Sequence, residues 1–337
     1  WRDWSSDVCS SDLLIREETV VDAPDPKTVQ WRRDVPAERR ARLRTGIIGA
    51  GVSGLLMAIK LQEAGLPFTI FEKNAYLGGN VRTLNGNVAA PGLPVDLRLE
   101  NGVLGFNRKT YPNFYRLMEE LGVPMKRVFG SMGLHLIEER RSYLLAPADK
   151  TVQRPWSFLR QTLRSIRPGL AMARHYQAAC RLPLAQLAET AVRDLLPADA
   201  ISAVWLRGIK MSAFSVPFDE TGALPVSIST PKTGSVWHIL PDGISSYLQR
   251  MLEIAKPAVR LNANIRAVRR TPAGVHIELA SGERLDFDKV VLAVTPGQVL
   301  GLLADADEEE RRRFSPWRDS SFSTTAHTGT DLYREFR

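Results

Sequence analysis

Two glycine clusters with an acidic residue between them are the part of this chain best suited to chemistry. The first cluster, at 49–54, has the sequence Gly-Ala-Gly-Val-Ser-Gly, Glu72 follows it, and the doublet Gly78-Gly79 comes next. Glycines with the spacing of the first cluster allow a tight turn, close approach of the backbone to a pyrophosphate, and close packing of a helix on a strand. An acidic side chain about 20 residues further on can bind a ribose hydroxyl. The spacing therefore indicates a dinucleotide site.

The neighbouring sequence predicts the strand, turn and helix that such a site needs. Residues 45–48 have a short apolar strand pattern, residues 55–64 suit a helix, and residues 67–72 suit a second strand. Unpaired N–H groups at the start of the helix would face the anion. An ordinary glycine turn and a solvated charge at Glu72 are the alternatives for each motif taken alone, but they do not explain the order of the motifs. The predicted contacts in this part are Gly49, Gly51, Val52, Ser53, Gly54, Glu72 and Lys73.

The second glycine cluster opens the sequence Gly-Gly-Asn-Val-Arg-Thr at 78–83, and here the chain resembles the flavin-containing amine oxidase and phytoene desaturase superfamily. The segments around 95–96, 105–107, 110–113 and 117–122 resemble its branch of predicted NAD/FAD-binding oxidoreductases. In that superfamily the doublet lies against the FAD pyrophosphate, so the resemblance implies FAD as the cofactor. Asn80 stands where an arginine is common, and Arg82 would supply the positive charge instead. The contacts added by the resemblance are Gly78, Gly79, Asn80, Arg82 and Thr83.

Later segments follow the order that the resemblance implies. Residues 258–268 resemble the family strand whose backbone, near Ile265, meets the adenine. Residues 274–287 have a hairpin pattern, and residues 288–296 have the pattern of a buried strand that leads to a loop. Any one of these could be ordinary core structure. The predicted fold class is α/β, with a Rossmann-type FAD-binding domain and an α+β substrate or cap domain.

We expect the following organisation along the chain. Residues 1–13, which repeat Ser-Ser-Asp, resemble a translated sequencing adapter and are expected to be non-native, and residues 14–43 form a charged leader. Residues 44–110 and 232–300 would form the FAD-binding domain, and residues 111–231 and 301–337 a cap domain that is truncated at its C-terminus. With Cys9 in the suspect segment, Cys180 has no partner for a disulfide, which favours a cytoplasmic location. No apolar run approaches the roughly 18 residues of a membrane span.

A basic amphipathic pattern occurs within the predicted cap. Five apolar residues recur at spacings of three and four, with arginines between them, and the chain carries a formal net charge of +8. One interpretation is a peripheral membrane contact through residues 156–181, or the mouth of a site for a lipid substrate. The alternative is the more common use of such a pattern, a helix whose apolar face meets the core. The basic and aromatic residues do not interleave as in a nucleic-acid module, so we expect no nucleic-acid partner. The apolar residues are Trp156, Leu159, Leu163, Ile166 and Leu170.

Catalytic residues are not identified by any motif. The five histidines lack the spacing of a metal site, and no metal is predicted. His238 precedes a segment where the resembled branch has a glycine-rich turn near the active face, so it is a candidate pocket residue, with a surface or core histidine as the alternative. The predicted function is an FAD-dependent oxidoreductase that moves a hydride from an apolar, lipid-derived substrate to flavin. The alternatives are a flavin- or nucleotide-binding partner of a lipid-modifying enzyme without redox turnover, and an NAD-dependent dehydrogenase, which would not need the doublet.

Overall fold

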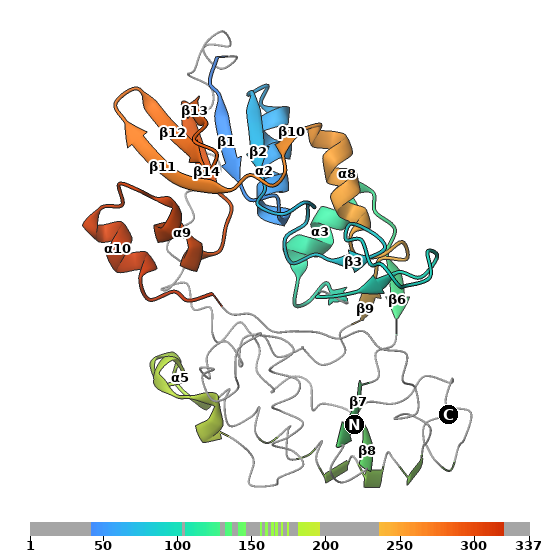
Figure 1. Cartoon of the computed structure of the whole chain (residues 1–337). Coiled ribbons are helices and arrows are strands. Elements are labelled where there is room, and N and C mark those ends of the chain that lie inside the picture. The colour runs from blue at the N-terminus through green and yellow to red at the C-terminus, as the bar shows by residue number, and fades with distance from the viewer. Residues whose placement is uncertain are drawn as a thin grey trace.

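The structure is a computed structural model of the chain (Figure 1). It describes residues 42–102, 105–128, 132–136, 141–145, 181–195 and 236–319, together with positions 156, 159, 160, 163, 164, 166, 167, 170 and 174. The predicted non-native segment at 1–13 and the predicted charged leader at 14–43, apart from residues 42 and 43, lie outside these residues. Of the predicted last part of the cap domain, 301–337, positions 320–337 lie outside them as well.

A four-stranded parallel sheet forms the centre of the first part of the chain, with strand order β10-β2-β1-β14. Helix α2 connects β1 to β2. Successive strand residues point to opposite faces, so Ile47 and Ile70 pack with the helix while Ile48 and Phe71 pack on the other side. The elements are β1 (Thr45–Ile48), α2 (Val52–Glu63), β2 (Phe68–Phe71), β10 (Ala258–Arg260) and β14 (Lys289–Leu292).

An antiparallel sheet of three strands covers the face opposite α2. Ile277 is fully buried in this layer, and the rings of Phe71 and Phe287 meet edge to face at 5.7 Å. A Cβ at Gly46 would lie 3.0 Å from the Ile277 side chain, so glycine at this position lets the two sheets approach closely. The predicted hairpin at 274–287 is confirmed. The strands are β11 (Ile265–Thr271), β12 (Gly274–Leu279) and β13 (Arg284–Phe287).

A group of shorter elements packs against α2 and shares its core. Strand β9 pairs with β5 and with β6, helix α3 follows β5, and helix α8 lies against α2. Leu55 of α2, Met118 of α3 and Tyr247 of α8 are buried in one hydrophobic cluster. The elements are β3 (Thr83–Leu84), β4 (Leu99–Glu100), β5 (Phe106–Asn107), α3 (Pro112–Leu121), β6 (Lys126–Val128), β9 (Trp237–Ile239) and α8 (Ser246–Ala255).

The remaining elements lie after β14 or in the middle of the chain. Helices α9 (Pro296–Leu302) and α10 (Glu308–Phe314) follow β14, and Arg270 of β11 bonds to Asp305 between the two helices and to Glu310 in α10. The middle elements are the hairpin of β7 (Met132–Leu136) and β8 (Arg141–Leu145), helix α5 (Leu184–Glu189) and the 3₁₀ turn η3 (Val192–Leu195). The structure confirms a mixed α/β fold, while the predicted division into two domains stays a prediction. Among the described helices, none has the length and apolar character needed to cross a bilayer.

Candidate functional site

The first glycine cluster forms the turn between β1 and α2. Gly49 has φ +101°, and its N–H donates to the Phe71 carbonyl at 2.8 Å. A Cβ at Gly49 would lie 2.4 Å from the Ala293 carbonyl oxygen, and a Cβ at Gly54 would lie 2.0 Å from the Gly49 carbonyl oxygen. Only glycine fits at these two positions, because the strand, the turn and the helix are in direct backbone contact.

Gly51 differs from its neighbours because packing does not require it. Its φ is −74°, and a Cβ there would meet nothing closer than the Gly79 Cα at 3.9 Å. It is the N-cap of α2, no side chain caps the helix, and the first turn contains no acidic residue. The first N–H groups of a helix carry partial positive charge and attract anions. The turn thus offers backbone donors and room for a phosphate group.

The glycine doublet lies directly against this turn. The Gly78 N–H donates to the Ala50 carbonyl at 2.9 Å, and Gly51 and Gly78 form a parallel bridge. Gly78 and Gly79 have φ of +122° and +61°, and a Cβ at Gly79 would approach the Gly51 Cα to 3.3 Å. The structure therefore brings together two clusters that are far apart in the sequence, and both present backbone at the point of contact.

Asn87 fixes the loop that carries the doublet. Its Nδ2 donates to the carbonyls of Leu77 at 2.8 Å and Val81 at 2.7 Å, and its Oδ1 accepts from the Thr83 N–H at 2.8 Å. Sequence reasoning missed Asn87, since a single amide in a loop carries no periodic or motif signal. Its role depends on three backbone groups whose positions only the folded loop defines.

Glu72 is buried at the end of β2, with 4% of its surface exposed. Its Oε2 accepts from the Ala50 N–H at 2.9 Å, and its Oε1 accepts from the N–H and Nδ2 of Asn74 at 2.9 and 2.8 Å. These donors compensate for removing the carboxylate from water. The alternative of a solvated charge is therefore wrong, and Glu72 lies beside the glycine turn as its spacing predicts.

Three other predicted contacts are exposed near these groups. Arg82 lies beside the doublet, where its Nε donates to the Gly79 carbonyl at 3.3 Å, while Lys73 and Asn80 expose their side chains. On α2, Val52 is half-buried and Ser53 is exposed in the first turn. These positions allow contact with a bound phosphate, and the contacts themselves stay predictions.

Thr83 links the doublet loop to the start of α8. It is 0% exposed, its Oγ1 donates to Glu100 Oε2 at 2.9 Å, and the same oxygen accepts from the Ser245 N–H at 3.0 Å. Glu100 Oε1 also accepts from the Ile244 N–H at 2.8 Å. The Thr83 hydroxyl therefore attaches the start of α8 to the doublet loop, and the predicted cofactor contact of Thr83 stays a prediction.

The chain between β10 and β11 crosses the end of β2. Glu72 donates its N–H to the Arg260 carbonyl at 2.9 Å, and its own carbonyl accepts from the Ala263 N–H at 2.8 Å. The segment 258–268 is consequently divided between two sheets, with Asn262 at φ +53° between the strands. Ile265 begins β11 two residues after this crossing, and its proximity to an adenine stays a prediction.

His238 lies on β9 between aromatic rings. Its ring is 5.3 Å from that of Tyr115 and 6.3 Å from that of Phe106. Its Nδ1 is buried without a hydrogen-bond partner, as are Asn107 Nδ2 and Thr110 Oγ1. The structure thus places His238 at a partly buried position with spare hydrogen-bonding capacity, and a role in a pocket stays a prediction. Within the described ranges, His, Cys, Asp and Glu side chains form no group of three that could hold a metal ion.

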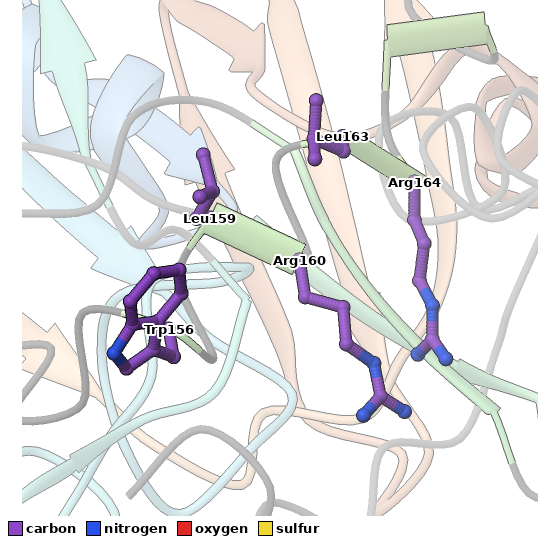
Figure 2. Close-up of a pocket in the computed structure, with 5 residues that line it drawn as sticks. All are labelled: Trp156, Leu159, Arg160, Leu163 and Arg164. Carbon is purple, nitrogen blue, oxygen red and sulfur yellow. The ribbon is translucent and has the colours of Figure 1, made fainter.

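The amphipathic pattern at 156–170 has helical backbone at its described positions, and its five apolar side chains are exposed. The core-facing alternative is therefore not what this structure shows. Trp156, Leu159, Arg160, Leu163 and Arg164 line a hollow of about 560 Å³ (Figure 2).

Comparison with known proteins gives a match over most of the chain. The family described as flavin containing amine oxidoreductase matches residues 52–327. Protoporphyrinogen oxidase 2, chloroplastic/mitochondrial, of Arabidopsis thaliana is 33% identical over 91 residues, which are 26% of this chain and 15% of that protein.

Similar solved structures include cyclohexylamine oxidase from Brevibacterium oxydans IH-35A and a triple mutant of putrescine oxidase. Each has a TM-score of 0.57 and 18% identity, and each match covers 81% of this chain and 63% of the other. A CLA-producing fatty acid isomerase from P. acnes has a TM-score of 0.50 and 21% identity, and the match covers 82% of this chain and 64% of the isomerase. These identities show a shared fold alone, and this chain spans less than two thirds of the length of these structures.

Proposed function

The chain belongs to the flavin containing amine oxidoreductase family, and from this premise we propose that it is an FAD-dependent oxidoreductase whose cofactor lies where the two glycine clusters meet. The observation that carries the proposal is the backbone contact between Gly51 and Gly78, at an uncapped helix start beside the buried carboxylate of Glu72. A dinucleotide requires donors for its pyrophosphate, close approach of the backbone, and an acceptor for a ribose hydroxyl. We infer that the parallel β1-α2-β2 unit is a Rossmann-type FAD-binding unit.

The residues of the chain have separate tasks in this proposal. The N–H groups of Val52 and Ser53 bind a phosphate oxygen, and Arg82 adds positive charge from the doublet loop. Glu72 holds the turn through the Ala50 N–H and accepts from a ribose hydroxyl. FAD supplies the hydride acceptor, so the protein mainly orients the substrate and excludes water.

We propose an apolar, lipid-derived substrate from which a hydride is transferred. The exposed apolar side chains at 156–170 support this class, since they provide a surface that an acyl chain can contact. Among proteins of similar fold, one is described as a fatty acid isomerase and others as amine oxidases, which fits a fold that accepts both classes.

Gly51→Ala tests the cofactor site without disturbing the fold. The new Cβ would be in ordinary contact at 3.9 Å and the backbone is unstrained, so the variant should fold, but the methyl group would occupy the space proposed for the pyrophosphate. We expect flavin occupancy, measured from the visible spectrum and the released chromophore, to fall at least about tenfold. Gly301→Ala, a helix position with no atom within 4 Å, is the matched control. Unchanged occupancy in Gly51→Ala would place the cofactor elsewhere.

The spectrum of the unmodified protein separates the remaining functions. A yellow protein that releases FAD, and whose flavin is bleached anaerobically by a lipid substrate, is the expected result. A yellow protein that no candidate lipid or amine reduces would favour the binding partner without turnover. A colourless protein that binds NADH but not added FAD would favour the dehydrogenase.

A further inference from the structure

An exposed apolar face occurs in the segment 156–170. Of the eleven large hydrophobic side chains that are exposed among the described residues, five fall in these fifteen positions. Their exposed fractions range from 46% for Leu159 to 81% for Trp156. Scattered apolar side chains are normal on a protein surface, but a contiguous group indicates an interaction site.

The leucine and arginine side chains of the segment extend in different directions (Figure 2). The described positions have helical backbone, and spacings of three and four place Trp156, Leu159 and Leu163 on one face. Figure 2 shows Leu159 and Leu163 pointing one way, while the side chains of Arg160 and Arg164 extend together in another direction. A hollow of about 560 Å³ lies along this surface.

The charge of the segment favours an anionic partner. Residues 156–181 contain five arginines and no aspartate or glutamate, although acidic residues are frequent elsewhere in the chain. Arginines flanking an apolar face with a tryptophan match an anionic lipid surface, where the apolar side chains enter the headgroup boundary and the guanidinium groups meet phosphates.

We propose that residues 156–170 form a docking surface for a bilayer that contains anionic lipids. Pairing with a second copy of the chain would cover the same apolar face, but it would bring together two copies of a segment that has five arginines and no aspartate or glutamate of its own, so the charge favours lipid. Vesicle docking by this surface does not require flavin reduction, and it would place the protein next to the lipid substrates of the proposed function.

Sedimentation of the full chain with vesicles tests the apolar part. We expect binding to vesicles of phosphatidylcholine and phosphatidylglycerol, and much weaker binding to phosphatidylcholine alone. The variant Leu159→Asp/Leu163→Asp should lower the vesicle partition coefficient at least about tenfold. Val95→Asp/Leu97→Asp adds the same charge at two other exposed apolar positions and should bind nearly like the unmodified chain.

Removing charge tests the basic part without adding any group to the apolar face. Arg160→Gln/Arg167→Gln, at two exposed arginines of the segment, should lower the partition coefficient roughly tenfold on anionic vesicles and have little effect on neutral ones. Arg266→Gln/Arg269→Gln on β11 removes the same charge elsewhere and is the control. Equal loss in both pairs would overturn the proposal, as would absence of binding at low salt. If the unmodified chain forms a dimer that Leu159→Asp/Leu163→Asp dissociates, and it does not bind vesicles, the face belongs to an interface with a second copy instead.

Discussion

The turn between β1 and α2 and the segment 156–170 arrange polar and apolar groups in opposite ways. In the turn, a carboxylate is buried and accepts from three N–H donors, whereas in the segment large apolar side chains are exposed. Each arrangement is costly in an ordinary globular fold. At the turn, hydrogen bonds inside the molecule offset the cost of burial, whereas the exposed segment would be covered by the bilayer that we propose as its partner.

Two glycines of the turn also differ in whether internal packing accounts for them. Packing requires glycine at position 54, because the Gly49 carbonyl oxygen lies where a side chain would be, while Gly51 has room beside it. The room beside Gly51 is where we propose that the pyrophosphate binds.

The largest effect is expected from Gly54→Ala. The added Cβ would lie 2.0 Å from the Gly49 carbonyl oxygen, so the strand and the helix must separate. We expect the free energy of unfolding to fall by at least about 3 kcal/mol, measured from urea denaturation. Gly301→Ala should leave it unchanged or raise it by up to about 1 kcal/mol. A small effect of Gly54→Ala would mean that the turn is looser than described.

Glu72→Gln tests whether the buried carboxylate stabilises the turn. An amide NH₂ would replace one acceptor oxygen and face an N–H donor from Ala50 or Asn74. We expect a loss of about 2 kcal/mol in the free energy of unfolding. Glu63→Gln removes an exposed carboxylate paired with Lys60 and should cost less than about 0.5 kcal/mol. Equal losses in the two variants would contradict the role given to Glu72.

The pair Thr83 and Glu100 can be tested by a double-mutant cycle. Thr83→Val keeps the shape of the side chain but removes the hydroxyl, and Glu100→Gln weakens the acceptor. We expect a coupling of about 1 kcal/mol between the two changes in thermal or urea unfolding. Additive losses would show that the hydroxyl and the carboxylate act separately.

A smaller, pH-dependent effect is expected from Arg270. Hydrogen bonds from Arg270 and from the Asp307 N–H hold the pKa of Glu310 below its ordinary value of 4.5. The stabilisation is therefore present above that value and is lost as the pH falls through the lowered pKa. Arg270→Gln should lower the unfolding temperature at pH 7, by an amount equivalent to at most about 1 kcal/mol, and the difference should shrink in acid. A difference that does not depend on pH would exclude this ion pair as its cause.

The smallest effect on stability is expected from Leu159→Asp/Leu163→Asp. Both side chains are exposed, so the free energy of unfolding should change by less than about 0.5 kcal/mol while vesicle binding is lost. A large loss of stability would show that these leucines are buried in the folded protein, and the contrast with the turn would then fail.

Local patterns predicted the central elements well. The strand at 45–48 and the hairpin strands at 274–279 and 284–287 have the predicted bounds, because strand period and turn chemistry are properties of neighbouring residues. Asn87 and Glu100 could not be found in this way, since each bonds to backbone groups of loops whose courses are set by packing. The break between β10 and β11 likewise depends on the crossing over Glu72.

By itself, the sequence determined the strand, glycine turn and helix, the acidic residue that follows, and which side chains of the amphipathic segment share a face. Backbone sterics and residue periodicity are sufficient for these features. Three further features depend on the tertiary structure: the doublet contacts the turn, Thr83 donates a hydrogen bond to Glu100, and the apolar face of the segment is exposed. These depend on which distant elements pack together, and burial is a property of that packing.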